Sequence, residues 1–295
     1  AQEPDGGWGS VGQTIDVILA AYAAGWDPTT ITTGNRNPLD YLKENLNPYL
    51  ENGPDAIGKA IIGLVAAGED PHDFNSIDLV EKLIETYDGE NQAFGSSENT
   101  WHQVFAILGL YSAGEPSPGD VIMTLKSLQQ PDGGWEYSVG FGSWPDNTAI
   151  AIQALLAAGT PADSDVILDG IKYLTSLQLD DGGWGDASST AFVVTALNAL
   201  GIVNNAWQTD FGTTPMDALF SFQLPSGGFM FASDFPDENL LSTISAAYAA
   251  VGGHYIIPAD KKPKTQIAGL IIQTDQENAA AACVPIEKEY ISGLA

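Results

Sequence analysis

The polar residues that could do chemistry gather in four short stretches, each at the expected start of an apolar helix. They are Glu98-Asn99-Thr100-Trp101-His102, Asp146-Asn147, Ser188-Ser189 and Glu238-Asn239. If these helices run side by side in one direction, the four stretches meet at one end. Carboxylates such as Glu98, Asp146 and Glu238 could then act as general acid and base. Polar groups that converge among aromatic rings also suit a small-molecule site.

Two long aromatic segments lead into two of these helix starts, from Tyr137 to Asn147 and from Phe229 to Asn239. The candidate ligand-binding residues are Trp101, His102, Tyr137, Phe141, Trp144, Asp146, Asn147, Phe231, Phe235, Glu238 and Asn239. The competing interpretation is that the rings fill the core and the acids cap helices. On that interpretation Trp101 is a core residue and His102 is a buried histidine with its hydrogen bonds satisfied.

Metal and cofactor chemistry finds little support in the sequence. Cys283 is the single cysteine, which excludes an internal disulfide framework and a multi-cysteine zinc site. The three histidines show no ligand spacing, and no nucleophile elbow, P-loop or dinucleotide fingerprint occurs. We therefore expect no resident cofactor or metal. Calcium held by Asp180, Asp181 and Asp186 remains an alternative, although no EF-hand pattern is present.

A repeat organises the elements that position these residues. Small residues followed by glycine end an apolar segment six times, at intervals of roughly 45 residues, as a helical-hairpin repeat would. The glycines are Gly25, Gly68, Gly114, Gly159, Gly201 and Gly252. Glycine at such a position takes the left-handed conformation that closes a helix.

A second mark of the repeat is the pattern Gln-x-x-x-Gly-Gly-aromatic. It spans residues 2–8, 129–135, 178–184 and 223–229, with a weaker copy at Phe94-Gly95 and a degenerate one between Asn47 and Gly53. The glycines permit a tight turn. We expect the glutamine amide to bond backbone groups left open at a helix end, and the aromatic ring to seal adjacent repeats.

Two kinds of helix lie between these marks. Amphipathic helices are predicted at 38–47, 76–87, 119–129, 165–177 and 214–222. Ala-rich helices that are apolar on more than one face are predicted at 12–24, 55–67, 98–113, 146–158, 188–200 and 239–251. The fold class is therefore all-α, an α6/α6 toroid with inner and outer helices. A sixth outer helix would precede Gln2, so the chain begins as a mature or trimmed protein would.

The run Gly170-Ile171-Lys172-Tyr173-Leu174, followed by Gln178, Gly182 and Trp184, resembles the QW motif of squalene and oxidosqualene cyclases. Similar repeats occur in prenyltransferase β-subunits, complement thioester domains, transcobalamin and intrinsic factor. The resemblance covers about residues 1–253 and implies a toroid. One fold hosts many activities, so the resemblance does not give the function.

The catalytic signatures of these families are incomplete here. Squalene-type cyclases protonate their substrate with an Asp-x-Asp-Asp motif, and Asp146 matches its proton-donating middle acid. Trp144 and Asn147 replace the first and last acids of that motif. The resemblance to prenyltransferases implies a zinc held by Asp, Cys and His, but Cys283 lies in the tail. The Cys-Gly-Glu-Gln sequence of thioester domains is absent.

The C-terminal segment differs from the repeats. We predict a toroid over 1–253, a linker over 254–266 and a β segment over 267–295. The run from Cys283 to Leu294 resembles the opening of the β-domain of transcobalamin-like proteins, which makes a corrinoid ligand conceivable. Two strands alone are marginal in water. Residues 264–290 could therefore pair with another chain by β-addition, which would make the protein a structural subunit of an extracellular assembly.

The charge balance limits the partners. The chain has 295 residues, 38 acids against 10 Lys and Arg, and a net charge of −28. Such a surface repels nucleic acid and anionic membranes, and no apolar run is long enough to span a bilayer. We expect a secreted or cell-surface protein that binds a small molecule or protein partner without catalysis. The enzymatic alternative is a terpene cyclase or carbohydrate-active enzyme that uses Asp146.

Overall fold

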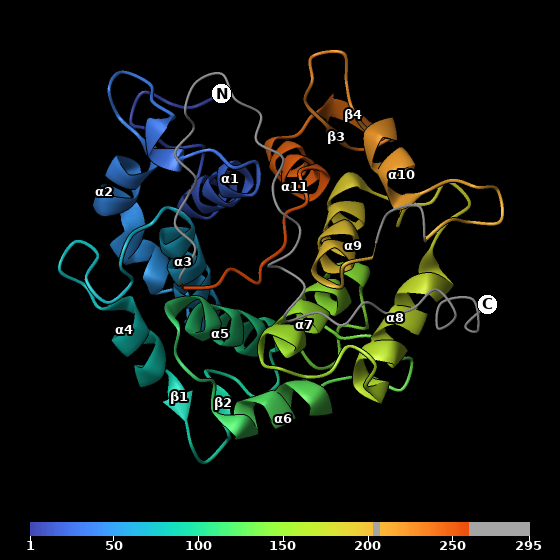
Figure 1. Ribbon diagram of the computed structural model, residues 1–295, viewed down its shortest axis with the longest axis horizontal. Coiled ribbons are helices and arrows are strands. Elements are labelled where there is room, and N and C mark those ends of the chain that lie inside the picture. Colours follow the sequence, from blue (N-terminus) through green and yellow to red (C-terminus); the bar gives the residue numbers. More distant parts are fainter. Residues whose placement is uncertain (203–206, 260–295) are drawn as a thin grey trace.

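Two concentric layers of helices form a toroid in the computed structural model, which describes residues 1–202 and 207–259 (Figure 1). The inner helices are α1 (Val11–Ala23), α3 (Pro54–Ala66), α5 (Thr100–Ala113), α7 (Pro145–Ala157), α9 (Ala187–Ala199) and α11 (Leu240–Ala250). The outer helices among these residues are α2 (Pro38–Leu50), α4 (Leu79–Glu85), α6 (Gly119–Ser127), α8 (Asp165–Leu177) and α10 (Pro215–Ser221). Each inner helix contacts the next, and α11 contacts α1, so the inner ring closes. The predicted toroid is confirmed.

The inner helices pack closely because small residues face one another. A Cβ atom on Gly58 of α3 would lie 2.0 Å from the carbonyl oxygen of Phe105 on α5. A Cβ on Gly109 would in turn lie 2.8 Å from the Cα of Gly58. The two helices therefore cross at a distance that only glycine permits, which explains why these helices are rich in small residues.

The Gly-Gly-aromatic turn joins one outer helix to the next. Gln129 Nε2 donates to the carbonyl of Gly133 within the turn at 2.8 Å and to the carbonyl of Val166 in the first turn of α8 at 2.9 Å. The indole N–H of the fully buried Trp135 donates back to the carbonyl of Leu125 on α6 at 2.9 Å. The role expected for the aromatic ring is confirmed, whereas the glutamine amide bonds carbonyls of the turn and of the next outer helix in place of groups left open at a helix end.

Both glycines of this turn are required by the docking. Gly133 has φ of +89°, and a Cβ there would lie 2.4 Å from the carbonyl oxygen of Asp169 on α8. A Cβ on Gly134 would meet the ring of Tyr173 at 2.9 Å. The first glycine of two other copies meets the next outer helix in the same way, Gly6 against Asn37 and Gly182 against Thr214.

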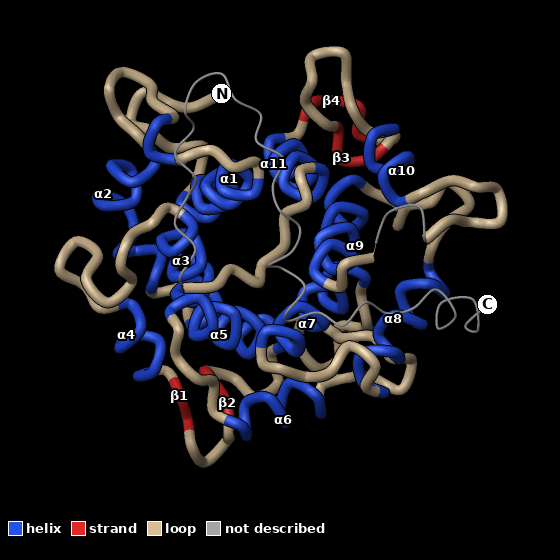
Figure 2. The backbone as a smooth tube through the Cα atoms, in the orientation of Figure 1, coloured by secondary structure: helices blue, strands red, loops and turns tan. Residues whose placement is uncertain are grey.

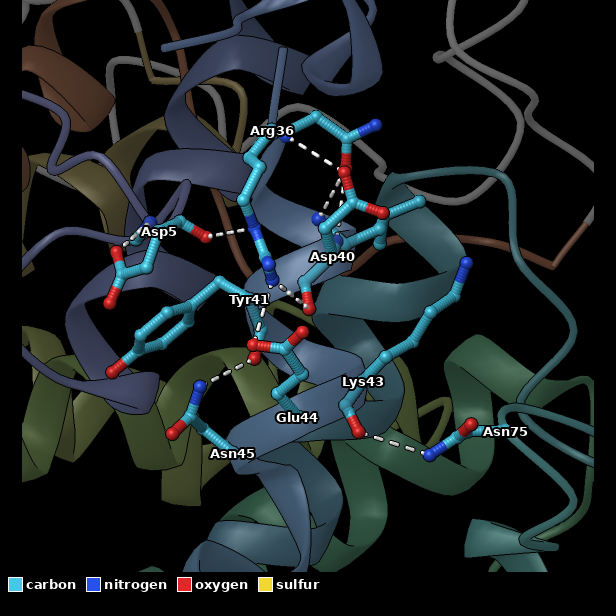
Figure 3. Close-up of polar contacts among 11 residues, drawn as sticks. Asp5, Arg36, Asp40, Tyr41, Lys43, Glu44, Asn45 and Asn75 are labelled. Carbon is cyan, nitrogen blue, oxygen red and sulfur yellow. Dashed lines mark hydrogen bonds and ion pairs between the residues drawn. The ribbon is translucent and has the colours of Figure 1, made fainter. Parts of the chain in front are cut away.

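The first copy of the turn is fastened to α2 by Arg36 (Figure 3). Its Nε donates to the carbonyl of Asp5 at 3.0 Å, while its Nη2 forms an ion pair with Glu44 at 2.8 Å. Gly7 lies against the ring of Tyr41. The N-terminal segment thus docks on the outer helix that follows it, as the later copies do.

Two short antiparallel hairpins were not expected. The first pairs β1 (Tyr87–Asp88) with β2 (Ala93–Phe94), and the second pairs β3 (Met230–Ala232) with β4 (Phe235–Glu238). In the first, Asp88 accepts hydrogen bonds from the backbone of Glu90 and Asn91 and so forms a tight turn. The helix α4 ends at Glu85, with Thr86 as its C-cap, short of the predicted boundary. A 3₁₀ turn, η1 (Pro28–Thr30), follows α1.

The first residues of the predicted linker lie inside the ring, where Figure 2 shows the loop after α11 running along the inner wall. Tyr255 and Ile257 are buried. The backbone N–H of Tyr255 donates to Gln153 Oε1 at 2.8 Å, and its ring stacks on Phe192 at 6.1 Å and meets Phe105 edge-on at 6.0 Å. This segment therefore fills the ring from the end where the inner helices finish.

The remaining linker residues, the predicted β segment 267–295, Cys283 and the proposed pairing segment 264–290 lie outside the described residues. The domain boundaries stay a prediction.

Replacement of Tyr255 by alanine should lower the free energy of unfolding by about 3–5 kcal/mol, because a large buried ring is lost and a cavity remains. Urea denaturation followed by circular dichroism measures this change. Tyr255→Phe keeps the ring and should stay within about 1 kcal/mol of the wild type. Equal stability of Tyr255→Ala and the wild type would show that the segment is an undocked linker.

Candidate functional site

Trp101 lies at the centre of a group of side chains at the starts of the inner helices. Its indole N–H donates to Asn147 Oδ1 at 2.7 Å, which joins α5 to α7. Its ring contacts Tyr137 edge-on at 5.8 Å, Phe105 at 5.4 Å and Phe192 at 6.3 Å. The structure therefore brings together three of the predicted site residues, Trp101, Tyr137 and Asn147, and joins them to aromatic residues of the ring interior.

The segment before α7 is fixed to the start of α5 by backbone hydrogen bonds. The carbonyl of Tyr137 accepts from the N–H of Thr100 at 2.9 Å, and the carbonyl of Glu98 accepts from the N–H of Val139 at 3.0 Å. Glu98 itself is exposed beside this segment. The aromatic loop thus has a defined position against the neighbouring inner helix.

The tip of this loop folds around the carboxylate of Glu136, which accepts hydrogen bonds from the backbone N–H groups of Gly140 and Gly142. The fold of the tip leaves Phe141 and Trp144 with 70% and 57% of their surface exposed. Two large aromatic side chains therefore face solvent on a loop whose backbone is held in place.

The second aromatic segment forms the β3–β4 hairpin, and the contacts of its predicted site residues are local to this hairpin, the adjacent turn and the start of α11. Phe231 and Phe235 pack on each other at 6.1 Å. Glu238 accepts from the Ser226 hydroxyl at 2.8 Å, and Asn239 caps α11. Within the described residues, no hydrogen bond or ring contact joins these four predicted site residues to the Trp101 group. No hydrogen bond among the described residues joins Glu98, Asp146 and Glu238 to one another, and their expected convergence stays a prediction.

His102 has the geometry of a structural histidine. Its Nδ1 accepts the backbone N–H of Ser96 at 3.0 Å, and its Nε2 lies 3.8 Å from Asp55 Oδ1. Burial lowers the pKa of His102, and the Asp55 charge only partly opposes this effect. Since Nδ1 already accepts a hydrogen bond, the ring is neutral at neutral pH with its proton on Nε2.

Asp146 lies in the first turn of α7. The N-cap residue is Trp144, which makes no side-chain capping bond, so Asp146 does not occupy the N-cap position. Its Oδ1 is buried without a hydrogen-bond partner. Burial raises the pKa of Asp146, the backbone N–H groups of Asp146 and Asn147 partly oppose this effect, and the nearby charge of Asp186 adds to it. Asparagine and aspartate do cap other inner helices, as Asn99 and Asp186 show.

Sequence reasoning missed an ion pair between two inner helices. Lys59 Nζ on α3 lies 2.8 Å from both carboxylate oxygens of Asp16 on α1. Burial raises the pKa of Asp16, while Lys59 lowers it. The Asp16 and Lys59 side chains keep 14% and 18% of their surface exposed, while Asp16 Oδ1 itself is buried. The sequence signal that could have indicated this ion pair is a single charged residue in the middle of an otherwise apolar helix.

Across residues 1–202 and 207–259, no group of three or more His, Cys, Asp or Glu side chains could hold a metal ion. In the predicted calcium alternative, Asp181 accepts from the N–H of Gly183 and Asp186 caps α9. Among the same residues, none of the helices has the length and apolarity needed to cross a membrane.

Comparison with known proteins agrees with this architecture. Residues 97–209 match the family model of the squalene-hopene cyclase C-terminal domain. Haptocorrin in complex with Cbi superposes with a TM-score of 0.59 at 16% identity, over 88% of this chain and 67% of that chain. The chain is an α/α toroid of the terpene cyclase and haptocorrin kind.

Two further solved toroids are similar in fold. A type II terpene cyclase from Scytonema, in complex with geranylgeranyl dihydroxybenzoate, has a TM-score of 0.50 at 14% identity and covers 81% of this chain and 87% of its own. An inactive α-1,6-mannanase variant of Salegentibacter, in complex with α-1,6-mannotriose, has a TM-score of 0.51 at 14% identity, with 82% and 87% covered.

The similar sequences are longer proteins. An uncharacterized protein of Bradyrhizobium diazoefficiens is 30% identical over 158 residues, which are 51% of this chain and 28% of that protein. The lanosterol synthase of Aspergillus fumigatus is 32% identical over 90 residues, which are 28% of this chain and 11% of the synthase.

The depressed pKa of His102 has a consequence for stability. Unfolded histidine titrates near pH 6.5, so below that pH the unfolded chain binds more protons than the folded one. This group's contribution is complete above about pH 6.5 and is lost as the pH falls. The glutamine introduced by His102→Gln can still accept the Ser96 N–H but cannot titrate.

Urea denaturation of both proteins between pH 7.5 and 5.5 tests this expectation. The free energy of unfolding should fall more steeply with decreasing pH in the wild type than in His102→Gln. Identical slopes would show that His102 does not carry the perturbed pKa.

Proposed function

We propose that this protein binds a small molecule, without catalysis, at the mouth made by Trp101 and residues 137–144, and that it works outside the cell or on its surface. The observation that carries the proposal is the exposure of Phe141 and Trp144 on a loop held against α5. Exposed aromatic surface costs solubility, so a soluble domain keeps such a patch where it meets a ligand or partner.

The continuity of the patch with the ring interior favours a small molecule over a flat protein surface. Tyr137 contacts both Phe141 at the exposed tip and Trp101 at the ring wall. Trp101 contacts Phe192 deeper inside. A ligand at this mouth would therefore meet aromatic side chains at the rim and along the wall, as pockets for organic molecules require. The terpene cyclase and mannanase structures described above hold geranylgeranyl dihydroxybenzoate and α-1,6-mannotriose, which supports a small-molecule ligand here.

The binding site can be tested with Nile red, an uncharged dye whose fluorescence rises on apolar surfaces. One molecule should bind per chain, and Phe141→Ala and Trp144→Ala should each weaken binding about fivefold or more. Phe211→Ala is the matched control, because that ring is 73% exposed on a different loop. Equal affinity of all four proteins would place the dye elsewhere and contradict the proposal.

A second candidate function is acid catalysis by Asp146, which the sequence aligns with the proton donor of squalene-type cyclases. The supporting observation is a carboxyl group whose pKa is raised by burial and whose Oδ1 has no hydrogen-bond partner. A carboxyl of this kind holds its proton to higher pH than an ordinary aspartate and can donate it. The acids that would flank it in a complete motif are absent at Trp144 and Asn147.

Incubation with geranylgeranyl dihydroxybenzoate, or with α-1,6-mannotriose, followed by mass spectrometry separates the two functions. Under the binding proposal, the wild type and Asp146→Asn both leave these compounds unchanged. Consumption by the wild type that is lost in Asp146→Asn would replace the binding proposal with acid catalysis, since the amide cannot donate that proton.

A further inference from the structure

We propose that the ligand at this mouth is an organic cation, an ammonium group carrying apolar substituents, held between the aromatic wall of the ring and the acids at the starts of the inner helices. This inference rests on the proposed binding function and specifies the chemical class of the ligand.

The aromatic wall is continuous along one side of the ring. Trp101 contacts Phe105 and Phe192, and both of these contact Tyr255, which closes the ring from the far end. Trp101 and Phe192 remain partly exposed, whereas Phe105 and Tyr255 are buried beneath them. The faces of aromatic rings carry negative electrostatic potential and attract cations, and alkylated ammonium groups also gain from apolar contact.

The formal charges around the same mouth sum to a negative value. Lys59 is the sole lysine or arginine on the six inner helices, and Asp16 neutralises it at 2.8 Å. Asp55 and Asp146 each have a buried carboxylate oxygen with no hydrogen-bond partner. His102 adds no positive charge, because its Nδ1 accepts the Ser96 N–H. Buried oxygens without partners are costly, and a cation nearby would offset that cost.

The helix N-termini at this end act in the opposite direction, since each carries a partial positive charge of about half a unit. Side chains at the helix starts already offset part of this positive charge. Side chains cap α1, α5, α9 and α11 through Ser10, Asn99, Asp186 and Asn239. Acidic side chains stand in the first turns of α3 and α7, at Asp55 and Asp146. A chain with a net charge of −28 also attracts cations to its surface and repels anions.

Three small molecules of nearly equal shape separate charge from size. Choline carries a trimethylammonium group, its carbon analogue carries an uncharged tert-butyl group, and the third analogue carries that tert-butyl group with a carboxylate. Binding to the full chain is measured by isothermal titration calorimetry at low salt. Choline should bind about tenfold or more tightly than the uncharged analogue, and the carboxylate analogue should bind weakest.

Variants locate the site. Trp101→Leu and Asp146→Asn should each weaken choline binding about fivefold or more, because one removes an aromatic face and the other a negative charge. Asp73→Asn is the matched control, since it removes the same charge from an exposed position on another part of the surface. Circular dichroism checks that Trp101→Leu folds. Phe192→Leu repeats the aromatic test if it does not.

The outcomes distinguish this inference from the function on which it rests. Equal binding of choline and the uncharged analogue, with Nile red still bound at the mouth, would overturn the cation class and leave the binding function intact. If Asp73→Asn weakens choline binding as much as Asp146→Asn does, the effect comes from surface charge alone, and the inference is also overturned. Loss of Nile red binding at the mouth would remove the proposed function itself.

Discussion

The docking of the Gly-Gly-aromatic turns at Gly6, Gly133 and Gly182 onto the next outer helix is the interaction on which the rest of this structure depends. Gly133 and Gly182 approach backbone carbonyls so closely that a Cβ atom at either would lie 2.4 Å from one of them. The tryptophan that follows each turn donates its indole N–H back to the preceding outer helix, from Trp135 to Leu125 and from Trp184 to Leu174. A docked turn therefore fixes the distance and direction between consecutive outer helices. It also sets the direction in which the following inner helix runs.

Because every turn leads into an inner helix in the same way, all the inner helices begin at one end of the toroid. This parallel arrangement decides where chemistry can occur. The helix starts leave backbone N–H groups that need acceptors, which explains why aspartate, asparagine and serine gather there. The loops that connect each Gly-Gly-aromatic turn to its inner helix lie at this same end of the toroid. The turn does not fix the length of these loops. The loop before α7 can thus carry exposed aromatic side chains without altering the scaffold.

The sequence predicts the local part of this structure and misses the part that depends on contacts across the ring. Each turn and helix pair is encoded within a single repeat, so the predicted helices agree with the observed ones to within a few residues. The Asp16–Lys59 pair joins residues 43 apart, and Tyr255 bonds Gln153 from 102 residues away. No periodic pattern reports such contacts. The site divides in the same way: Trp101, Tyr137 and Asn147 meet through adjacent helices, whereas Phe231 and Phe235 project from a hairpin of their own.

The segment through Tyr255 gives the toroid two unlike ends, and this asymmetry bears on function. Gln153 bonds both Tyr255 and Thr195, so a polar network inside the ring holds the segment as well as apolar packing does. A buried amide with several partners specifies one arrangement, because a shifted segment would leave those partners unsatisfied. The ring is thus occupied from one end, and the proposed binding site lies at the other. The turns that build this scaffold lie outside the mouth, so loop residues at the mouth can vary without altering the ring.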